Sequence, residues 1–366
     1  MIQEGKIGVF EASSLVIFMV ASKALFGAVR ELVEATGPSA WYTTIISGIT
    51  ALIGFWIIIR LMQRFPGQEL VSILKTVYGR ITGSLIALII CFLYIYNAAS
   101  FTREFTEAVK VFEYPLTPPS FIMILILLAV IVLLYYGLET TARTTSFFTW
   151  PLIVGMISIF FLGLPLGKLT NLYPLLGHGL DRTIITGLLR SSVYGEVIGL
   201  TIILNALQGI ENFKKAGKHG IIISIIIISL SLFIYSLIFP YSVSVENTIP
   251  LLTLTRIIEY GRFFQRFESI YIFIWSVAAT LTTAINLYLA LSIYCKTFRI
   301  NDHRVLVLPL CILLFSIAII PKDIVTITSI YVHYLRQYGW IIFIGLPLLT
   351  LIVAAVRGKK GESANA

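Results

Sequence analysis

The sequence predicts an all-α membrane protein with about ten transmembrane helices. Of its 366 residues, 58% are hydrophobic and only 12% are charged, and the mean hydropathy is +0.93. This composition is too apolar for a soluble globular chain. Apolar runs of about twenty residues, the length that crosses roughly 30 Å of hydrocarbon, follow one another along almost the whole chain. We therefore expect one transmembrane domain and no sizeable soluble domain.

Hydropathy also sets the expected order of the helices. The expected spans cover residues 8–33, 40–63, 82–110, 117–137, 144–167, 186–210, 217–240, 268–294, 305–321 and 338–356. Ten spans divide into a first repeat of about residues 8–167 and a second of about residues 186–356. A short cytoplasmic tail, residues 357–366, follows the last span.

The charge distribution predicts that both termini are cytoplasmic. With the N-terminus inside, the inner segments hold 15 basic and 6 acidic residues, as the positive-inside rule requires. The spans keep Lys23, Glu11 and Glu196, and the remaining charges are assigned to the outer segments and their borders. The net charge of +9 therefore reflects membrane topology, and we expect no binding of nucleic acid. No small-residue cleavage site follows the first apolar stretch, so the first span is expected to remain in an integral membrane protein.

Two ionisable residues interrupt expected spans near their middles. Lys23 lies in the first apolar run and Glu196 in the sixth, and a charge at membrane depth usually faces a cavity or a partner. Small residues flank both, and these weaken helix continuity. The candidate residues at the two positions are Ser22, Lys23 and Gly27 in the first span and Tyr194, Gly195, Glu196 and Gly199 in the sixth.

Spans one and six correspond to each other if ten helices form two inverted repeats of five. Paired interrupted helices of this kind form the substrate site of such proteins, because their exposed ends offer amide donors and carbonyl acceptors. These groups suit a zwitterionic amino acid, and Lys23 and Glu196 could pair there. The alternative is that Lys23 extends toward the interface while Glu196 lines a dry contact between helices.

Polar side chains in spans three and eight could complete this site. They are Tyr94 and Asn97 in the third span and Thr280, Thr282, Thr283 and Asn286 in the eighth. For any one hydroxyl, a bond to its own helix backbone is the simpler explanation. As a group that faces the broken helices, they are candidate substrate-binding residues.

The sequence offers no catalytic or metal-binding pattern. The four histidines are scattered, and Cys91, Cys295 and Cys311 all lie in apolar runs. No Gly-rich phosphate motif is present. We therefore expect no enzyme, no cofactor and no metal.

Two outer loops are long enough to hold structure of their own, about residues 168–185 and 241–267. The second contains TLTRIIEYGRFFQRF, in which apolar and basic residues alternate at helical spacing. This pattern fits a helix that lies on the membrane interface, and an ordinary connecting loop is the alternative.

Several segments, taken in order, resemble the endospore germination permease family, the B subunits of nutrient germinant receptors in the amino acid–polyamine–organocation transporter superfamily. They are Arg64-Phe65-Pro66-Gly67 with LVSILKTVYGRITG, SFTREFTEAVKVFEYPLTPP, YYGLETTAR, NLYPLL, and FFQRFESIYIFIW. The resemblance covers nearly the whole chain. It implies a LeuT-like fold of five plus five helices with broken helices 1 and 6, and a structural ion pair or helix-start contact of Arg266 with Glu268. Lys23 departs from the family pattern, in which this break is small and polar or glycine-rich; its ammonium could bind a ligand carboxylate or take the place of a coupling cation.

The resemblance predicts a function as a receptor subunit. The chain would bind a small nutrient, with an amino acid expected, in a mid-membrane pocket between spans one, three, six and eight, in the cell membrane or the spore inner membrane. It would signal germination to an A-type membrane subunit and a lipoprotein C-type subunit. The alternative is a secondary amino-acid transporter that is coupled to protons or sodium or that exchanges substrates.

Overall fold

Helices make up nearly all of the computed structural model, which describes residues 5–259 and 267–361. In hydrocarbon every backbone polar group needs a partner within its own segment, and helices provide one. Among the described residues, seven helices are long and apolar enough to cross a membrane: Val29–Arg64, Arg80–Phe112, Pro119–Tyr136, Leu138–Leu166, Ile210–Ile238, Phe267–Phe298 and Ile324–Val356. The expectation of an all-helical membrane protein is confirmed.

The first half of the chain forms eight α-helices. They are α1 (Val9–Ala21), α2 (Ala28–Thr36), α3 (Ala40–Arg64), α4 (Leu70–Tyr78), α5 (Arg80–Phe112), α6 (Pro119–Tyr136), α7 (Leu138–Gly163) and α8 (Leu180–Leu189). The second half contains α9 (Ile210–Ile238), α10 (Tyr241–Ser244), α11 (Pro250–Ile257), α12 (Phe267–Phe298), α13 (Arg304–Ile319), α14 (Ile324–Thr326), α15 (His333–Tyr338) and α16 (Leu346–Val356).

Three expected spans start too late. The spans drawn from residues 144, 217 and 338 begin at Leu138, Ile210 and Ile324 in the structure. The helices from Leu138 and Ile210 begin with polar turns, which lower the hydropathy at their starts. The helix from Ile324 begins with apolar residues, and its polar stretch HYLRQYG lies further along, where the expected span was cut short. The correction is largest for the last span, where two π-helical segments, η7 (Ile327–Val332) and η8 (Ile341–Gly345), connect α14, α15 and α16 into one helix.

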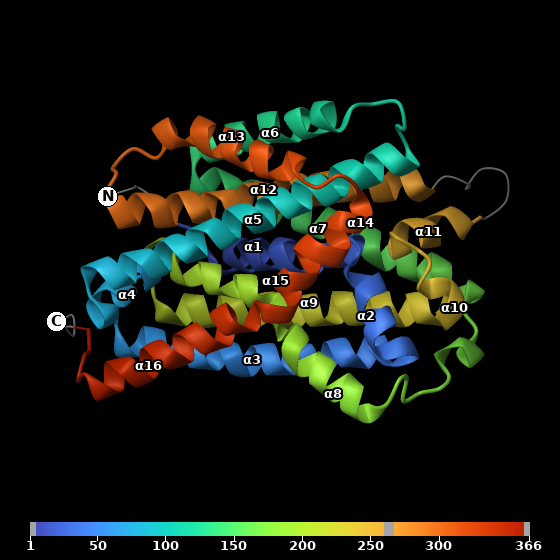
Figure 1. Ribbon diagram of the computed structural model, residues 1–366, viewed down its shortest axis with the longest axis horizontal. Coiled ribbons are helices and arrows are strands. Elements are labelled where there is room, and N and C mark those ends of the chain that lie inside the picture. The colour runs from blue at the N-terminus through green and yellow to red at the C-terminus, as the bar shows by residue number, and fades with distance from the viewer. Residues whose placement is uncertain (1–4, 260–266, 362–366) are drawn as a thin grey trace.

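Helix α1 lies in the middle of the bundle (Figure 1). It packs against α7, α9 and α12, and every residue from Ala12 to Ala21 is buried. The pairs α5 with α12 and α3 with α9 make the other large contacts. In Figure 1, α6 and α13 lie along one edge of the bundle and α3, α8 and α16 along the other. The first span is thus surrounded by protein, which allows it to carry polar groups.

The segments assigned to the cytoplasmic side meet at one end of the molecule. Arg64 donates hydrogen bonds to the carbonyls of Lys359, at 2.9 Å, and Ala354, at 3.1 Å. At the same end Lys296 forms an ion pair of 2.8 Å with Glu69. Helices α10 and α11 lie at the opposite end (Figure 1). This separation agrees with the expected alternation of loops.

The first span is broken. Helix α1 ends at Ala21, a 3-10 turn η1 (Ser22–Leu25) follows, and Phe26 is extended before α2 begins. The Ser22 hydroxyl donates to the Phe18 carbonyl, which also accepts from Thr282 at 2.9 Å. Side-chain hydroxyls that bond this carbonyl compete with the regular helix ladder.

The sixth span departs even further from an α-helix. After α8, residues Arg190–Thr201 form a 3-10 helix, η5, and a second short turn, η6 (Leu204–Leu207), precedes α9. Runs of 3-10 helix longer than three or four residues are uncommon and often mark functional hinges. Gln208 at φ 59° and Gly209 at φ 126° then turn the chain into α9.

The outer segment 241–267 contains a short helix that packs on the bundle. Helix α11 includes Leu251, Leu252 and Leu254, all fully buried, and contacts α7, α9 and α12. This part of the segment therefore packs on the bundle, and residues 260–266 of the stretch expected at the interface lie outside the described residues. The expected contact of Arg266 with Glu268 lies outside the described residues.

Candidate functional site

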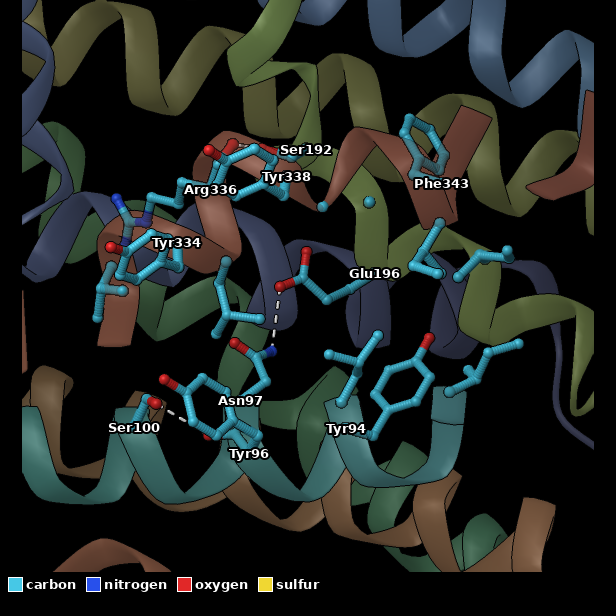
Figure 2. A pocket seen from close by; sticks show the side chains of 18 of the residues that line it. Tyr94, Tyr96, Asn97, Ser100, Ser192, Glu196, Tyr334, Arg336, Tyr338 and Phe343 are labelled. Carbon is cyan, nitrogen blue, oxygen red and sulfur yellow. Dashed lines mark hydrogen bonds between the residues drawn. The ribbon is translucent and has the colours of Figure 1, made fainter. Parts of the chain in front are cut away.

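A cavity of about 480 Å³ lies where the two broken spans meet α5 and the last long helix (Figure 2). Its walls are mainly apolar and aromatic. The aromatic lining includes Tyr94, Tyr96, Phe101, Tyr334, Tyr338 and Phe343. Its charged groups are Lys23, Glu104, Glu196 and Arg336. A concave apolar site with a few convergent polar groups is the usual form of a small-molecule site.

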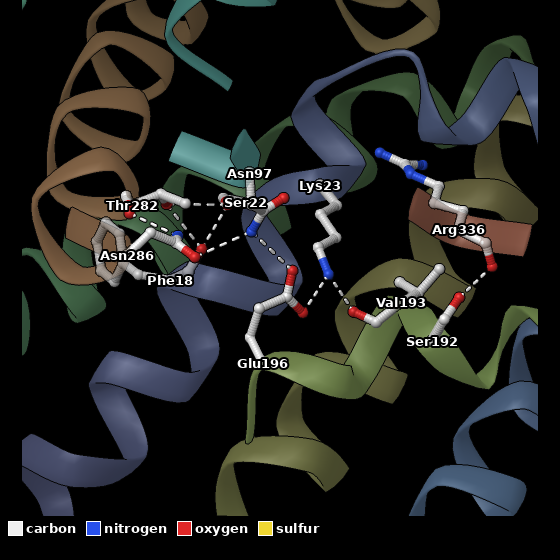
Figure 3. Close-up of polar contacts among 10 residues, drawn as sticks. All are labelled: Phe18, Ser22, Lys23, Asn97, Ser192, Val193, Glu196, Thr282, Asn286 and Arg336. Atoms are coloured by element: carbon white, nitrogen blue, oxygen red, sulfur yellow. Dashed lines mark hydrogen bonds and ion pairs between the residues drawn. The ribbon is translucent and has the colours of Figure 1, made fainter. Parts of the chain in front are cut away.

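Lys23 and Glu196 are in direct contact. The Lys23 Nζ lies 2.5 Å from the Glu196 Oε2 and also donates to the Val193 carbonyl (Figure 3). Their side chains are only 5% and 12% exposed. This ion pair connects η1 to η5, so the two interrupted segments are in direct contact. The reading in which Lys23 extends to the interface does not fit this geometry.

Asn97 extends the pair into a network. Its Nδ2 donates to the Glu196 Oε1 at 3.1 Å and to the Asn286 Oδ1 at 2.9 Å, and Asn286 donates to the Thr282 carbonyl at 2.8 Å. Ser22 and Thr282 share a hydrogen bond of 3.2 Å (Figure 3). The segments η1 and η5 and the helices α5 and α12 therefore meet through one chain of hydrogen bonds.

The other candidate residues are spread around this network. Tyr94 and Gly195 line the cavity, whereas Gly199 packs against Leu289 and Tyr94. Thr283 bonds Thr102 at 3.0 Å.

Two candidates turn away from the cavity. The Thr280 hydroxyl donates to the Ser276 carbonyl of its own helix at 2.9 Å. This is the backbone bond that the sequence analysis considered the simpler explanation for a single hydroxyl. The Tyr194 hydroxyl points to Thr44 of α3.

Glu104 was missed by the sequence analysis. It is 2% exposed, lines the cavity, and accepts a hydrogen bond of 2.7 Å from the Gly27 amide at the start of α2. Gly27, a predicted site residue, therefore acts through its backbone. The expected span 82–110 contained Glu104, but the counting of charges assigned this residue to the outer segments and their borders. The structure places it inside α5, where it lines the cavity.

Glu104 has charged neighbours along α5 that were missed for the same reason. Arg103 and Glu107 are both buried and form an ion pair of 2.7 Å, and Arg103 also donates to the Pro321 carbonyl at 2.8 Å. Their i, i+4 spacing is the signal that the charged stretch continues the helix.

Arg336 is the second missed group. It lies in α15, between the two π-helical segments, and its side chain lines the cavity while its carbonyl accepts from Ser192. The sequence analysis assigned it to an outer loop, because the stretch around it is polar.

A further ion pair links α2 to η5. Arg190, at the start of η5, lies 2.5 Å from Glu31 of α2, and both side chains are largely buried. The two interrupted segments are thus linked twice, here and through Lys23 and Glu196.

Metal ligands are not gathered here. Within residues 5–259 and 267–361 no group of three or more His, Cys, Asp or Glu side chains could hold a metal ion.

Sequence comparison relates the whole chain to spore germination proteins. A family model described as "Spore germination protein" matches residues 6–327. Spore germination protein A2 of Bacillus subtilis is 25% identical over 97% of this chain and 97% of its own length. Spore germination protein YndE of the same organism is 25% identical over 98% of each chain.

Structural comparison shows the fold of transporters. A substrate-bound, outward-open Na⁺-coupled sialic acid symporter aligns with a TM-score of 0.68 at 14% identity, covering 97% of this chain and 85% of that one. MHP1, a nucleobase-cation-symport-1 family transporter in a closed conformation with bromovinylhydantoin bound, aligns with a TM-score of 0.60 at 13% identity, covering 96% and 94%. These are receptor and transporter families rather than enzyme families. The chain belongs to the spore germination protein family, the B-type subunits of germinant receptors, and has a LeuT-like transporter fold.

Proposed function

We propose that this chain is the nutrient-binding membrane subunit of a germinant receptor, with its ligand in the cavity between the broken spans. The observation that carries the proposal is the position of that cavity: it is walled by η5, α5 and the last helix, and Lys23 of η1 reaches into it. A site at the joint of two helix groups can bind their arrangements with different affinities, which is what a ligand needs in order to shift a conformational equilibrium.

The proposal includes the finer architecture. The chain crosses the membrane about ten times as two inverted repeats, residues 8–167 and 186–356, with both termini and the tail 357–366 cytoplasmic. The interrupted first and sixth spans support this, since they occupy corresponding places in such repeats. The signal passes to an A-type membrane subunit and a lipoprotein C-type subunit, as membership of the receptor family suggests.

Ligand-induced stabilisation of the purified protein tests the site. The panel is the twenty common L-amino acids, inosine and glucose, and the measurement is the unfolding midpoint in detergent. A ligand at 100 times its Kd adds about 2.7 kcal/mol, which is readily measured. We expect at least one compound to raise the midpoint of the wild type.

A pair of glycine substitutions ties that response to the cavity. Gly195→Phe fills it, because Gly195 lines the cavity and its added Cβ would already lie 3.3 Å from Phe343. Gly345→Phe is the matched control, since its Cβ meets only Ile341, at 3.9 Å. The response should survive Gly345→Phe and disappear in Gly195→Phe. An equal response in both variants, or no response in the wild type, would contradict the proposal.

The transporter fold supports a second function, secondary transport of an amino acid. The same cavity would then alternate between the two sides of the membrane, coupled to protons or sodium or by exchange. Uptake of radiolabelled amino acids into proteoliposomes separates the two functions. Accumulation driven by an ion gradient would establish transport, whereas binding without accumulation favours the receptor.

A further inference from the structure

Arg336 is a buried cation without a counter-ion at contact distance. Its side chain belongs to a residue that is 7% exposed, and among the described residues its guanidinium makes no hydrogen bond and no ion pair. Figure 3 shows it turned away from the contact between Lys23 and Glu196. An unpaired charge at membrane depth is costly and is rarely kept without a role.

Glu104 is the complementary buried anion. One carboxylate oxygen accepts from the Gly27 amide at 2.7 Å, so the side chain is held in place, and within the described part of the chain no cation lies at ion-pair distance from it. Arg336 is near enough to Glu104 to interact with it electrostatically across the cavity, but the two form no ion pair.

The other ionisable groups around the cavity are already paired. Lys23 contacts Glu196, Arg190 contacts Glu31 and Arg103 contacts Glu107, all within 2.7 Å. Of the charged cavity residues that the structure describes, Glu104 and Arg336 are therefore the two that remain available to a ligand.

Building on the proposed function, we infer that Arg336 and Glu104 form a receptor for a zwitterion, in which Arg336 binds the carboxylate and Glu104 binds the ammonium of an α-amino acid. A guanidinium can hold a carboxylate through two parallel hydrogen bonds. Lys23 then contributes less than Arg336 to recognising the carboxylate, because Glu196 neutralises its ammonium and two of its three N–H donors already bond Glu196 and the Val193 carbonyl.

The rest of the cavity indicates the ligand's side chain. Tyr96, Phe101, Tyr334, Tyr338 and Phe343 supply apolar and aromatic surface to the cavity that the two charges line. Such walls favour a large apolar or aromatic side chain over a charged one, since a further charge would be buried without a partner.

Three probes separate the two charges of the ligand. They are L-phenylalanine, L-phenylalaninamide, which lacks the carboxylate, and 3-phenylpropanoate, which lacks the ammonium. Dissociation constants are measured for the purified full chain by isothermal titration and by the shift in unfolding midpoint. We expect L-phenylalanine to bind on the order of 100-fold more tightly than either analogue, because each analogue leaves one buried charge unpaired.

Single substitutions should remove this discrimination one charge at a time. Arg336→Met should weaken the binding of L-phenylalanine until its Kd equals that of L-phenylalaninamide, and the Kd of the amide itself should not change. Arg336→Lys should restore part of the lost affinity for L-phenylalanine. Glu104→Gln should instead weaken the binding of L-phenylalanine until its Kd equals that of 3-phenylpropanoate. Without ligand, Arg336→Met should unfold at the wild-type midpoint or above it, because it removes an uncompensated charge; a purely structural arginine would lower that midpoint.

The result that overturns the inference differs from the one that overturns the proposed function. If Arg336→Met keeps the wild-type Kd for L-phenylalanine, or if the wild type binds all three probes equally or not at all, the zwitterion receptor is wrong. The cavity can still be the nutrient site in that case, provided that another compound of the panel responds and Gly195→Phe abolishes its response. If no compound of the panel responds, or if Gly195→Phe leaves the response intact, both the zwitterion receptor and the proposed nutrient site are wrong.

Discussion

Two sets of opposite charges face the same cavity, and they differ in one respect. Lys23 and Glu196 touch at 2.5 Å and are further bonded by Val193 and Asn97. Arg336 and Glu104 are as deeply buried but do not meet. We call Lys23 with Glu196 the closed pair and Arg336 with Glu104 the open pair. A buried pair in contact and hydrogen-bonded stabilises the fold, whereas two buried charges that stay apart can each still bind a ligand group of opposite charge.

The difference also separates two roles within one site. The closed pair joins η1 to η5, the interrupted segments of spans one and six. The two charges of the open pair, on α5 and α15, form no bond to each other in the described structure, and Glu104 bonds only the Gly27 amide there. We therefore expect substitutions in the closed pair to act mainly on stability, and those in the open pair to act mainly on ligand binding.

Breaking the closed pair on one side should have the largest effect on stability. Lys23→Met leaves the Glu196 carboxylate buried without its cation, and we expect a loss of about 3–5 kcal/mol in the free energy of unfolding. The measurement is reversible unfolding in mixed micelles of increasing SDS content, with helix content followed by circular dichroism.

The double variant Lys23→Met, Glu196→Gln is the control for this prediction. It removes both charges, so most of the lost stability should return. If the single variant is as stable as the wild type, the two groups do not depend on each other. If the double variant is no better than the single one, the loss comes from packing of the lysine stem rather than from charge.

The closed pair could be predicted from the sequence, and the open pair could not. Lys23 and Glu196 each stand alone in an apolar run, where a single charge is conspicuous. Glu104 stands in the polar stretch TREFTEAVK, which lowers hydropathy at the end of a span and reads as a border. The expected span 82–110 did continue through this stretch, and the i, i+4 spacing of Arg103 and Glu107 supports the helix, but neither indicates that Glu104 faces a cavity.

Arg336 carries no comparable signal. The stretch YVHYLRQYG around it is polar enough to read as a loop, yet it forms helix between two π-helical segments. Its neighbours in space, Ser192 and the cavity wall, are far away in sequence, so only packing brings it to the site. Hydropathy predicted the class of the protein, and the isolated charges with their small neighbours predicted the two interrupted segments. Hydropathy was wrong about where the last helix begins.

An intermediate effect is expected at Asn97, which links the closed pair to α12. Asn97→Leu leaves the Glu196 Oε1 and the Asn286 Oδ1 without this donor, and each unsatisfied buried acceptor is costly. We expect a loss of about 1–3 kcal/mol in the free energy of unfolding, measured in the same SDS titration.

Ser100→Ala is the matched control for Asn97. Ser100 lies one turn further along α5 and lines the same cavity, but its hydroxyl donates only to the Tyr96 carbonyl of its own helix. Its removal should change stability by less than about 0.5 kcal/mol. Equal losses in the two variants would mean that the network around Glu196 adds nothing beyond ordinary cavity packing.

The smallest effect is expected at an ion pair of the same length on the surface. Arg143 and Glu139 also lie 2.5 Å apart, but their side chains are 71% and 41% exposed, against 5% and 12% for Lys23 and Glu196. Water screens the exposed pair and offers each charge an alternative partner, so Arg143→Met should cost about 0.5 kcal/mol or less. The same SDS titration should give a midpoint close to that of the wild type for Arg143→Met, and a much lower one for Lys23→Met. A loss at Arg143 that approaches the loss at Lys23 would show that contact distance, rather than burial, sets the strength of these pairs, and the contrast between closed and open charges would lose its physical basis.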